Sequence, residues 1–170
     1  MDVIIPAAQK LLQDFRSRGL PVIHTAMAHD VVDSNVPGDM GLWHHKIPIE
    51  VLKTGSETAA IDSRIAALPG EHVIVKKRAC GFHGTFLAGM LKAMRVDTVI
   101  VTGMTAAACV RNSMDDALAE VFRPIAVREA IGDRTAGAVE WNPFDIDAKS
   151  GDVEPLSRGL DYLNSNDLDV

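Results

Sequence analysis

The stretch HVIVKKRACGFHGTFLAGMLKAMRVDTVIVTG, residues 72–103, decides the fold class of this chain. It opens with HVIVK at residues 72–76, whose continuous apolar character is typical of a buried strand, and it closes with a similar run at residues 97–103. Between the two, residues 85–95 have the apolar spacing of an amphipathic helix. The side chains of this helix that we expect to face inward are Leu87, Met90, Leu91 and Met94. A strand, a helix and a second strand in this order predict two parallel strands joined by a helical crossover.

The same alternation of patterns extends in both directions from this stretch. Upstream, residues 4–18 have one apolar helical face, and residues 21–26 form a short β-rich run. A short helix is expected over residues 62–68, where Pro-Gly follows as a breaker. Downstream, residues 123–127 predict a fourth strand, and a last helical region begins near Ala136. The helix before that fourth strand is expected to bury one face, made of Val110, Met114, Ala117, Leu118 and Val121.

These elements predict a single three-layer α/β domain over residues 1–170, with a mainly parallel sheet covered by helices on both faces. A chain of 170 residues with 47% apolar and 24% charged residues is long enough and apolar enough to bury one sizeable core. Residues 27–58 show little periodicity. A segment of that length without regular structure favours a functional lid or an oligomer contact.

Net charge and cysteine content narrow the classes of partner. The formal net charge of −6 disfavours broad contact with nucleic acid or an anionic membrane, although one basic pocket can still bind a small anion. Two cysteines do not make a disulfide framework in a chain of this length. We find no secretory signal and no apolar run long enough to cross a bilayer. We therefore expect a soluble cytoplasmic protein whose partner is a small molecule.

Two side chains that can carry chemistry follow the ends of strands. In open parallel sheets, ligands bind beyond the carboxyl ends of the strands. Lys76 closes the strand at residues 72–76, and Cys109 follows the strand at residues 97–103 at the start of the next helix. A helix N-terminus and a nearby lysine both favour thiolate over thiol. The small-sided loop at residues 103–109 also offers backbone N–H groups that can stabilise an oxyanion.

The residues by themselves leave other interpretations open. A lone cysteine is most often a core residue, and a lysine at a strand end is most often solvated. Cys80 is a competing thiol, but no helix begins directly behind its turn, so we interpret Cys80 as structural.

Metal and nucleotide cofactors are not expected. The candidate metal ligands are His24, His29, His44 and His45. Their spacing does not match a zinc pattern, and we interpret them as scattered surface histidines. Neither a GxGxxG motif nor a GxxxxGK[ST] loop occurs, which disfavours a nucleotide-binding module.

The segments VIVKKRACGFHGTFLAGML and VDTVIVTGMTAAACVRNSMDDAL resemble the isochorismatase-like cysteine hydrolases. That superfamily has a Rossmann-like α/β fold and includes nicotinamidases, isochorismatases, maleamate amidases and N-carbamoylsarcosine amidohydrolases. The later segment FRPIAVREAIGDRTAGAVEWNPFDIDAKSGDVE, with its GDR turn, is similar to the N-carbamoylsarcosine branch in particular. The close match covers about residues 72–163. It implies a cysteine-dependent amidohydrolase that releases ammonia from a small N-carbamoyl or amide substrate.

The resemblance also implies a role for each matching residue. Cys109 attacks the amide carbonyl, and Lys76 lies beside the thiolate and supports its charge. The peptide bond before Thr105 is expected to be cis, and the N–H groups of Thr105 and Cys109 would form the oxyanion hole. Arg134, in the GDR turn, would bind a substrate carboxylate, for which a guanidinium offers a two-pronged geometry. Close relatives form tetramers, so we expect a homo-oligomer.

One catalytic group of the family has no match in this chain. The family carries an aspartate at the end of its first strand, which precedes the helix that begins here near Ile4. Asp2 lies on the wrong side of that helix, and Asp30 follows a different strand. We therefore expect a missing N-terminal strand rather than a natural truncation, because loss of a central strand exposes two strand edges. Two alternatives stay open: an amidase of the maleamate amidase or nicotinamidase type, and an inactive member that serves as a subunit or binding module.

Overall fold

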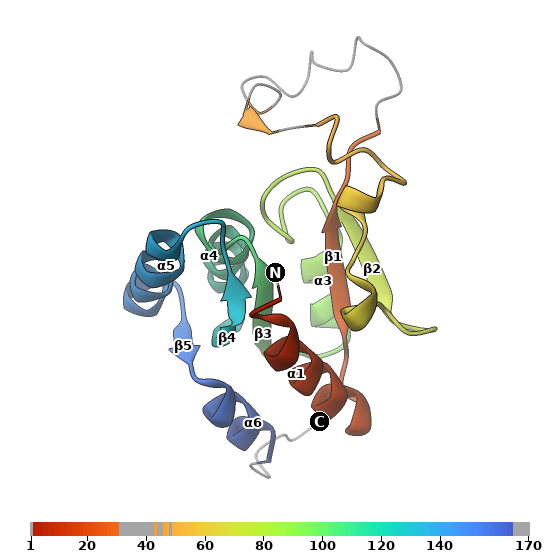
Figure 1. The fold of residues 1–170 in the computed structure, drawn as a ribbon. Coiled ribbons are helices and arrows are strands. Elements are labelled where there is room, and N and C mark those ends of the chain that lie inside the picture. The colour runs from red at the N-terminus through yellow and green to blue at the C-terminus, as the bar shows by residue number, and fades with distance from the viewer. Residues whose placement is uncertain (1, 31–42, 44–45, 48, 165–170) are drawn as a thin grey trace.

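The computed structural model describes residues 2–30, 43, 46–47 and 49–164. Strands and helices alternate along most of the chain (Figure 1). In chain order the elements are α1 (Ile5–Ser17), β1 (Ile23–Met27), η2 (Glu57–Ala59), η3 (Ser63–Ile65), β2 (His72–Lys76), α3 (Leu87–Ala93), β3 (Thr98–Met104), η4 (Ala106–Val110), α4 (Arg111–Ala119), β4 (Arg123–Gly132), α5 (Ala136–Lys149), β5 (Asp152–Glu154) and α6 (Leu156–Asn164). The segments η2 and η3 are short 3₁₀ turns, and η4 is a π-helical turn.

The strands form two sheets in which every pairing is parallel. β1 pairs with β2, so that Met27 lies opposite Lys76. β4 lies between β3 and β5, and the ends of β3 and β4 are in register, with Met104 opposite Gly132. Within the described residues the two sheets are not paired with each other. The α/β class with parallel pairing is therefore confirmed, and the expected additional strand stays a prediction.

Helices cover both faces of the β3–β4–β5 sheet. Successive residues of β4 point to opposite faces. Val127 therefore packs with Leu11 of α1, whereas Ala126 packs with Met114 of α4. α6 joins α1 on the first face, and Ile146 of α5 joins α4 on the second (Figure 1). Burial of each such large apolar side chain contributes about 1.5–3 kcal/mol, so this three-layer packing is the main support of the sheet.

The end of α4 differs from the expectation that Leu118 and Val121 are buried. α4 ends before Val121, which has a left-handed φ of 71°. The N–H of Phe122 then donates to the Ala117 carbonyl at 2.9 Å, which closes the helix and buries Phe122 in place of Val121. Leu118 and Val121 are 48% and 87% exposed. The prediction is wrong at Val121 because the helix stops before it, and it is also wrong at Leu118, which lies within α4 but is half exposed.

α3 shows the same effect at its own end. Leu87 and Leu91 are buried, and Met90 packs partly buried against them, as predicted. Met94 follows the last helical residue and is 39% exposed, which is contrary to the prediction. The next residue, Arg95, has a left-handed φ of 58°, and the chain leaves the helix there.

The segment at residues 62–68 is not the helix that its sequence predicts. Its regular part is the 3₁₀ turn Ser63–Ile65. The Asp62 carboxylate accepts the N–H of Arg64 at 3.0 Å, and this local hydrogen bond favours a turn over a longer helix.

β2 is buried on one face rather than on both. Ile74 and Lys76 are buried, whereas Val73 and Val75 are 46% and 50% exposed. Ile74 packs with Leu87 and other residues of the α3 side. The expectation that HVIVK is a fully buried strand is therefore wrong, because the side chains that point away from α3 are not covered by another element of the described chain.

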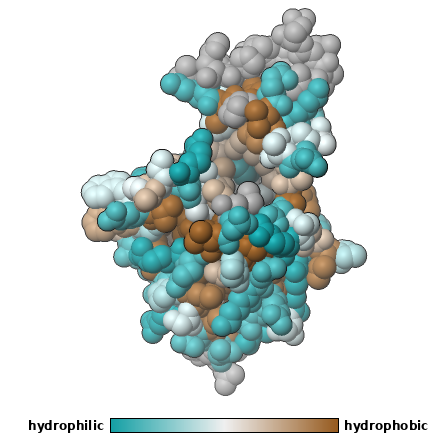
Figure 2. Space-filling model, viewed as in Figure 1, coloured by the Kyte–Doolittle hydropathy of each residue, from teal (hydrophilic) through white to brown (hydrophobic). Residues whose placement is uncertain are grey.

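The surface carries apolar side chains as well as polar ones. Figure 2 shows hydrophobic patches between hydrophilic ones on the face seen in Figure 1. Trp141 and Phe144 of α5 are 67% and 61% exposed, and their ring centroids lie 5.4 Å apart. An exposed aromatic pair of this kind is common at protein contact surfaces.

Two further expectations concern membrane contact and the segment at residues 27–58. Among the helices that the structure describes, none is long and apolar enough to span a membrane. The expected lid or oligomer contact falls partly on residues outside the described part of the chain, namely 31–42, 44–45 and 48.

Candidate active site

Two strands from different sheets deliver the candidate catalytic pair. β2 ends at Lys76, and the turn η4 after β3 carries Cys109. The Nζ atom of Lys76 lies 3.2 Å from the Sγ atom of Cys109, across a sequence separation of 33 residues. The structure therefore places the two side chains that the sequence singled out within hydrogen-bond distance of each other.

Lys76 is a buried lysine with a full set of acceptors. It is 4% exposed. Besides Sγ of Cys109, its Nζ donates to the carbonyl oxygen of Arg78 at 3.2 Å and to that of Ala79 at 3.4 Å. An ammonium carries three N–H donors, and three acceptors surround this one. A buried lysine nitrogen requires such partners, and Sγ of Cys109 is one of the three.

Cys109 lies in a tight turn that joins β3 to α4. The peptide bond between Met104 and Thr105 is cis, as the resemblance implies. The Thr105 carbonyl accepts the N–H groups of Ala108 at 3.2 Å and of Val110 at 3.0 Å. Cys109 itself is partly exposed, which a thiol that reacts with a dissolved substrate requires.

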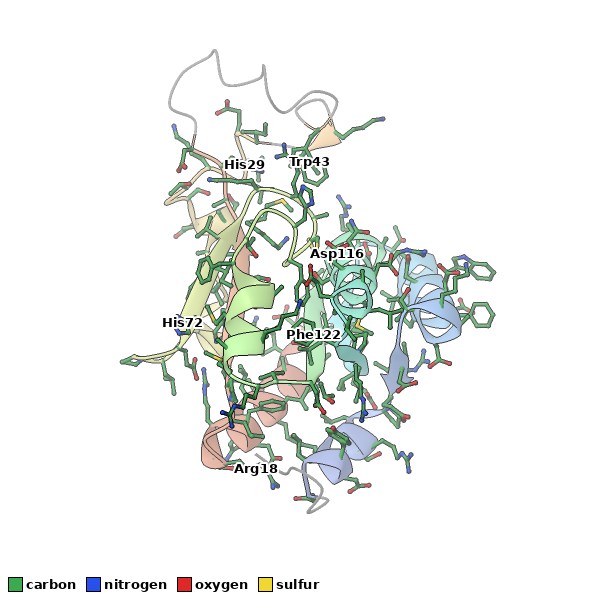
Figure 3. The ribbon with its side chains drawn as sticks, turned by 180° about the vertical axis from the view of Figure 1, so that it is seen from behind. Arg18, His29, Trp43, His72, Asp116 and Phe122 are labelled. Carbon is green, nitrogen blue, oxygen red and sulfur yellow. The ribbon has the colours of Figure 1, made fainter. Side chains whose placement is uncertain are left out.

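Cys80 occupies a different environment. It is 5% exposed, and its Sγ donates to the Oδ2 atom of Asp116 at 2.8 Å. Asp116, labelled in Figure 3, lies on α4. Burial, and next the Asp116 carboxylate, raise the pKa of the Cys80 thiol. These contacts favour a neutral structural thiol at Cys80, in line with the sequence interpretation.

The GDR turn lies against the turn that carries Cys109. The Asp133 carboxylate accepts the N–H of Ala107 at 2.8 Å and the N–H of Arg134 at 2.7 Å. The Arg134 side chain is 83% exposed, and its Nε lies 4.0 Å from Oδ1 of Asp133. The backbone of Arg134 thus lies close to the turn that carries Cys109, and its guanidinium is in solvent. Asp133 was not singled out from the sequence, because the strand predicted at residues 123–127 ends before it and β4 continues to Gly132; its place next to Arg134 was the available signal.

Asp2 and Asp30 have polar contacts with residues other than Lys76 and Cys109. Asp2 forms an ion pair with Arg64 at 2.8 Å. Asp30 accepts the Thr54 hydroxyl at 2.6 Å and the Lys77 ammonium at 3.1 Å. The Thr54 hydroxyl, and next Lys77, lower the pKa of the Asp30 carboxyl. These two contacts thus stabilise the charged form of Asp30.

His29 is buried, which contradicts its interpretation as a surface histidine. It is 3% exposed and lies beyond the end of β1 (Figure 3). Its N–H donates to the Leu52 carbonyl at 2.8 Å, and its carbonyl accepts the Thr54 N–H at 2.9 Å, so a local bridge draws the residue inward. Burial, and next the charges of Lys77 and Arg78, lower the pKa of the imidazole, which favours its neutral form.

Metal ligation has no candidate cluster in the described part of the chain. Among those residues, no group of three or more His, Cys, Asp and Glu side chains is placed to hold a metal ion. His24 contacts the Glu71 carboxylate at 3.2 Å, and His44 and His45 lie outside the described residues. The expectation of a metal-free site stays a prediction.

Known sequences resemble this chain over nearly its whole length. The isochorismatase domain model matches residues 1–149. An N-carbamoylsarcosine amidase from an Arthrobacter species is 49% identical over 166 residues, which cover 97% of this chain and 63% of that protein. A maleamate amidohydrolase from Pseudomonas putida is 38% identical over 160 residues, which cover 94% of this chain and 74% of that protein. The chain thus spans less than two thirds of the length of the first of these relatives.

Solved structures resemble the fold described above. An N-carbamoylsarcosine amidase from Thermoplasma acidophilum has a TM-score of 0.75 and 26% identity, with coverage of 91% of this chain and 83% of that one. A cysteine hydrolase from Pseudomonas syringae has a TM-score of 0.86 at 21% identity, covering 96% and 81%, and shows likeness of fold alone. With a parallel α/β fold, a family model that spans most of the sequence and a relative of nearly one-half identity, the chain belongs to the isochorismatase family.

Proposed function

We propose that this chain is a cysteine-dependent amidohydrolase that cleaves a small N-carbamoyl or amide substrate and releases ammonia. The observation that carries the proposal is the 3.2 Å contact between Nζ of Lys76 and Sγ of Cys109. The thiolate is the nucleophilic form of cysteine, and a neighbouring ammonium and a helix N-terminus both favour it. Cys109 is partly exposed, so the nucleophile is accessible.

The proposed reaction is an acyl transfer through sulfur. The Cys109 thiolate adds to the substrate carbonyl carbon, and the N–H groups of Thr105 and Cys109 stabilise the resulting oxyanion. The carbon–nitrogen bond breaks, and ammonia leaves once its nitrogen has taken up a proton. Water then cleaves the bond between the acyl or carbamoyl carbon and sulfur, which regenerates the thiolate beside Lys76.

The proposed substrate is N-carbamoylsarcosine or a similar N-carbamoyl amino acid. The 49% identity to a protein of that name supports this choice, and Arg134 supplies a cation beside the Cys109 turn for the substrate's carboxylate. The test is ammonia release from N-carbamoylsarcosine, maleamate and nicotinamide, compared as kcat/KM. We expect N-carbamoylsarcosine to give the highest value. A higher value for maleamate would favour that amidase type, and binding without turnover of any of the three would favour the binding-module alternative.

Replacement of Arg134 by lysine is expected to raise KM for N-carbamoylsarcosine by roughly 5–50-fold and to change kcat by less than about threefold. The substrate carboxylate is negative in both the ground state and the transition state, so the guanidinium stabilises both about equally. Steady-state kinetics measure the two constants. Arg158→Lys, an exposed arginine on α6, is the matched control and should leave KM unchanged. An unchanged KM in the Arg134 variant would remove Arg134 from the site.

We also propose that the chain forms one hydrolase domain, acts in the cytoplasm and assembles as a homo-oligomer, a tetramer by family resemblance. The exposed Trp141 and Phe144 support assembly, since burial of aromatic surface stabilises subunit contacts. Light scattering after size-exclusion chromatography measures the assembled mass, and a monomer across the working concentration range would oppose this part of the proposal.

A further inference from the structure

We infer that Asp133 is a positioning residue of the Cys109 site. Its carboxylate holds the turn Ala106–Val110, called the nucleophile turn below, in register with the end of β4. The inference deepens the proposed function and depends on it. Asp133 directly follows β4, whose last residue, Gly132, lies opposite Met104 at the end of β3. The carboxylate therefore emerges beside the cis peptide that begins the nucleophile turn.

The hydrogen bonds of Asp133 tie two chain segments together. Its Oδ2 accepts the N–H of Ala107 at 2.8 Å, and its Oδ1 accepts the N–H of Arg134 at 2.7 Å. The Asp133 side chain is 4% exposed, whereas Ala107 and Arg134, whose N–H groups it accepts, are exposed residues. Ala107 belongs to the turn Ala106–Val110 and precedes Cys109 by two residues. One buried carboxylate thus fixes the nucleophile turn and the residue proposed to bind the substrate carboxylate.

The nucleophile turn has no cap from its own sequence. Thr105 is the N-cap residue of Ala106–Val110, and its side chain makes no capping hydrogen bond. The first N–H groups of a helical turn lack partners within the turn and require an outside acceptor. Asp133 supplies that acceptor from a neighbouring strand, and its negative charge is favourable at a helix N-terminus.

Catalysis depends on this placement through the oxyanion donors. The proposed donors are the N–H groups of Thr105 and Cys109, which flank Ala107 on either side. An oxyanion donor acts at a separation of about 2.7–3.1 Å, and a displacement near 1 Å can cost on the order of 100-fold in rate. Loss of the Asp133 clamp is therefore expected to misplace the donors without removing the thiolate.

Asp133→Asn tests the inference with little change in shape. An amide has one oxygen acceptor where the carboxylate has two, so either the Ala107 or the Arg134 N–H loses its partner. We expect kcat for N-carbamoylsarcosine to fall by roughly 10–100-fold per folded enzyme. Alkylation of Cys109 by iodoacetamide needs no oxyanion donor, so its rate should not decrease. A purely structural role would leave kcat per folded enzyme unchanged.

Asp147→Asn is the matched control. The Asp147 carboxylate on α5 accepts the N–H of Val153 at 2.9 Å, so the substitution makes the same chemical change away from the nucleophile turn. We expect its kcat to equal that of the unaltered chain. Asp133→Glu keeps both acceptors and the charge on a longer side chain, so we expect a smaller loss of kcat than in Asp133→Asn. This variant provides the test if Asp133→Asn folds poorly.

Amide hydrogen exchange in the peptide at residues 103–110 gives a readout that needs no turnover. Exchange should accelerate in Asp133→Asn and not in Asp147→Asn. Unchanged exchange, unchanged kcat in Asp133→Asn, or an equal fall in kcat in the control would each overturn the inference. Ammonia release that persists in Cys109→Ser would instead overturn the proposed function, and hydrogen exchange would still show whether Asp133 holds the turn.

Discussion

Replacement of Cys109 by serine is expected to lower kcat for ammonia release by roughly 10⁴-fold or more. A serine hydroxyl is not ionised at neutral pH, and the ammonium of Lys76, 3.2 Å from Sγ in the unaltered chain, cannot make it so. The substitution replaces Sγ by a less nucleophilic oxygen and changes the side-chain volume little, so the fold should persist. Steady-state ammonia release from N-carbamoylsarcosine, with circular dichroism to verify folding, measures the effect.

Cys80→Ser is the control for the loss of a thiol. Cys80 donates to Asp116 at 2.8 Å, and a serine hydroxyl can donate in the same place. We expect kcat to stay within about threefold of the unaltered chain, with any loss appearing in stability. A dead Cys80→Ser variant beside an active Cys109→Ser variant would show that the nucleophile is assigned to the wrong residue.

Replacement of Lys76 by methionine is expected to lower kcat by about 10²–10⁴-fold. The substitution removes the cation that faces Sγ, so less of Cys109 is thiolate at neutral pH. Alkylation of Cys109 by iodoacetamide at pH 7 should slow for the same reason. The variant should also be less stable, because the carbonyls of Arg78 and Ala79 lose their donor at a cost of about 1–3 kcal/mol each.

Lys77→Met is the matched control for the loss of a lysine. Lys77 donates to the Ala28 carbonyl and to Asp30, and its side chain is 45% exposed. We expect its kcat and its rate of Cys109 alkylation to be nearly unchanged. Alkylation of the Lys76→Met variant at the rate of the unaltered chain, with thermal unfolding showing a folded protein, would contradict the proposed support of the thiolate by Lys76.

Helices and strands could be predicted from the local sequence where the spacing of apolar residues matched one buried face. The strands near residues 72–76, 97–103 and 123–127 and the helices at α1 and α5 lie where their patterns predict. The errors at Met94 and Val121 occur at helix ends, and others concern the segment at residues 62–68 and the exposed face of β2. Val121 takes a left-handed φ of 71°. Glycine usually occupies this conformation at a helix end, and because a valine stands here, the sequence did not signal where the helix stops.

The pairing of Lys76 with Cys109 could be predicted from the sequence for a general reason. Parallel strands bring their carboxyl ends to one edge, so residues at strand ends converge even when they are far apart in the chain. Lys76 closes one strand pattern, Cys109 lies in the turn after another, and the resemblance singled out the same two positions. Arg134 was found through its motif, and its exact contacts with a substrate depend on a bound molecule rather than on local sequence.

The sequence by itself determined the parallel α/β class and the positions of Lys76 and Cys109, because periodicity and strand order are local properties of the chain. Only the tertiary structure decided which side chains find a hydrogen-bond partner and which are buried beneath another element. His29 is buried because a backbone bridge to the segment around Lys53 draws it inward, and Val73 and Val75 are exposed because α3 covers the opposite face. Asp133 reaches Ala107 because β3 and β4 end in register, and such a contact depends on how separate segments meet in space.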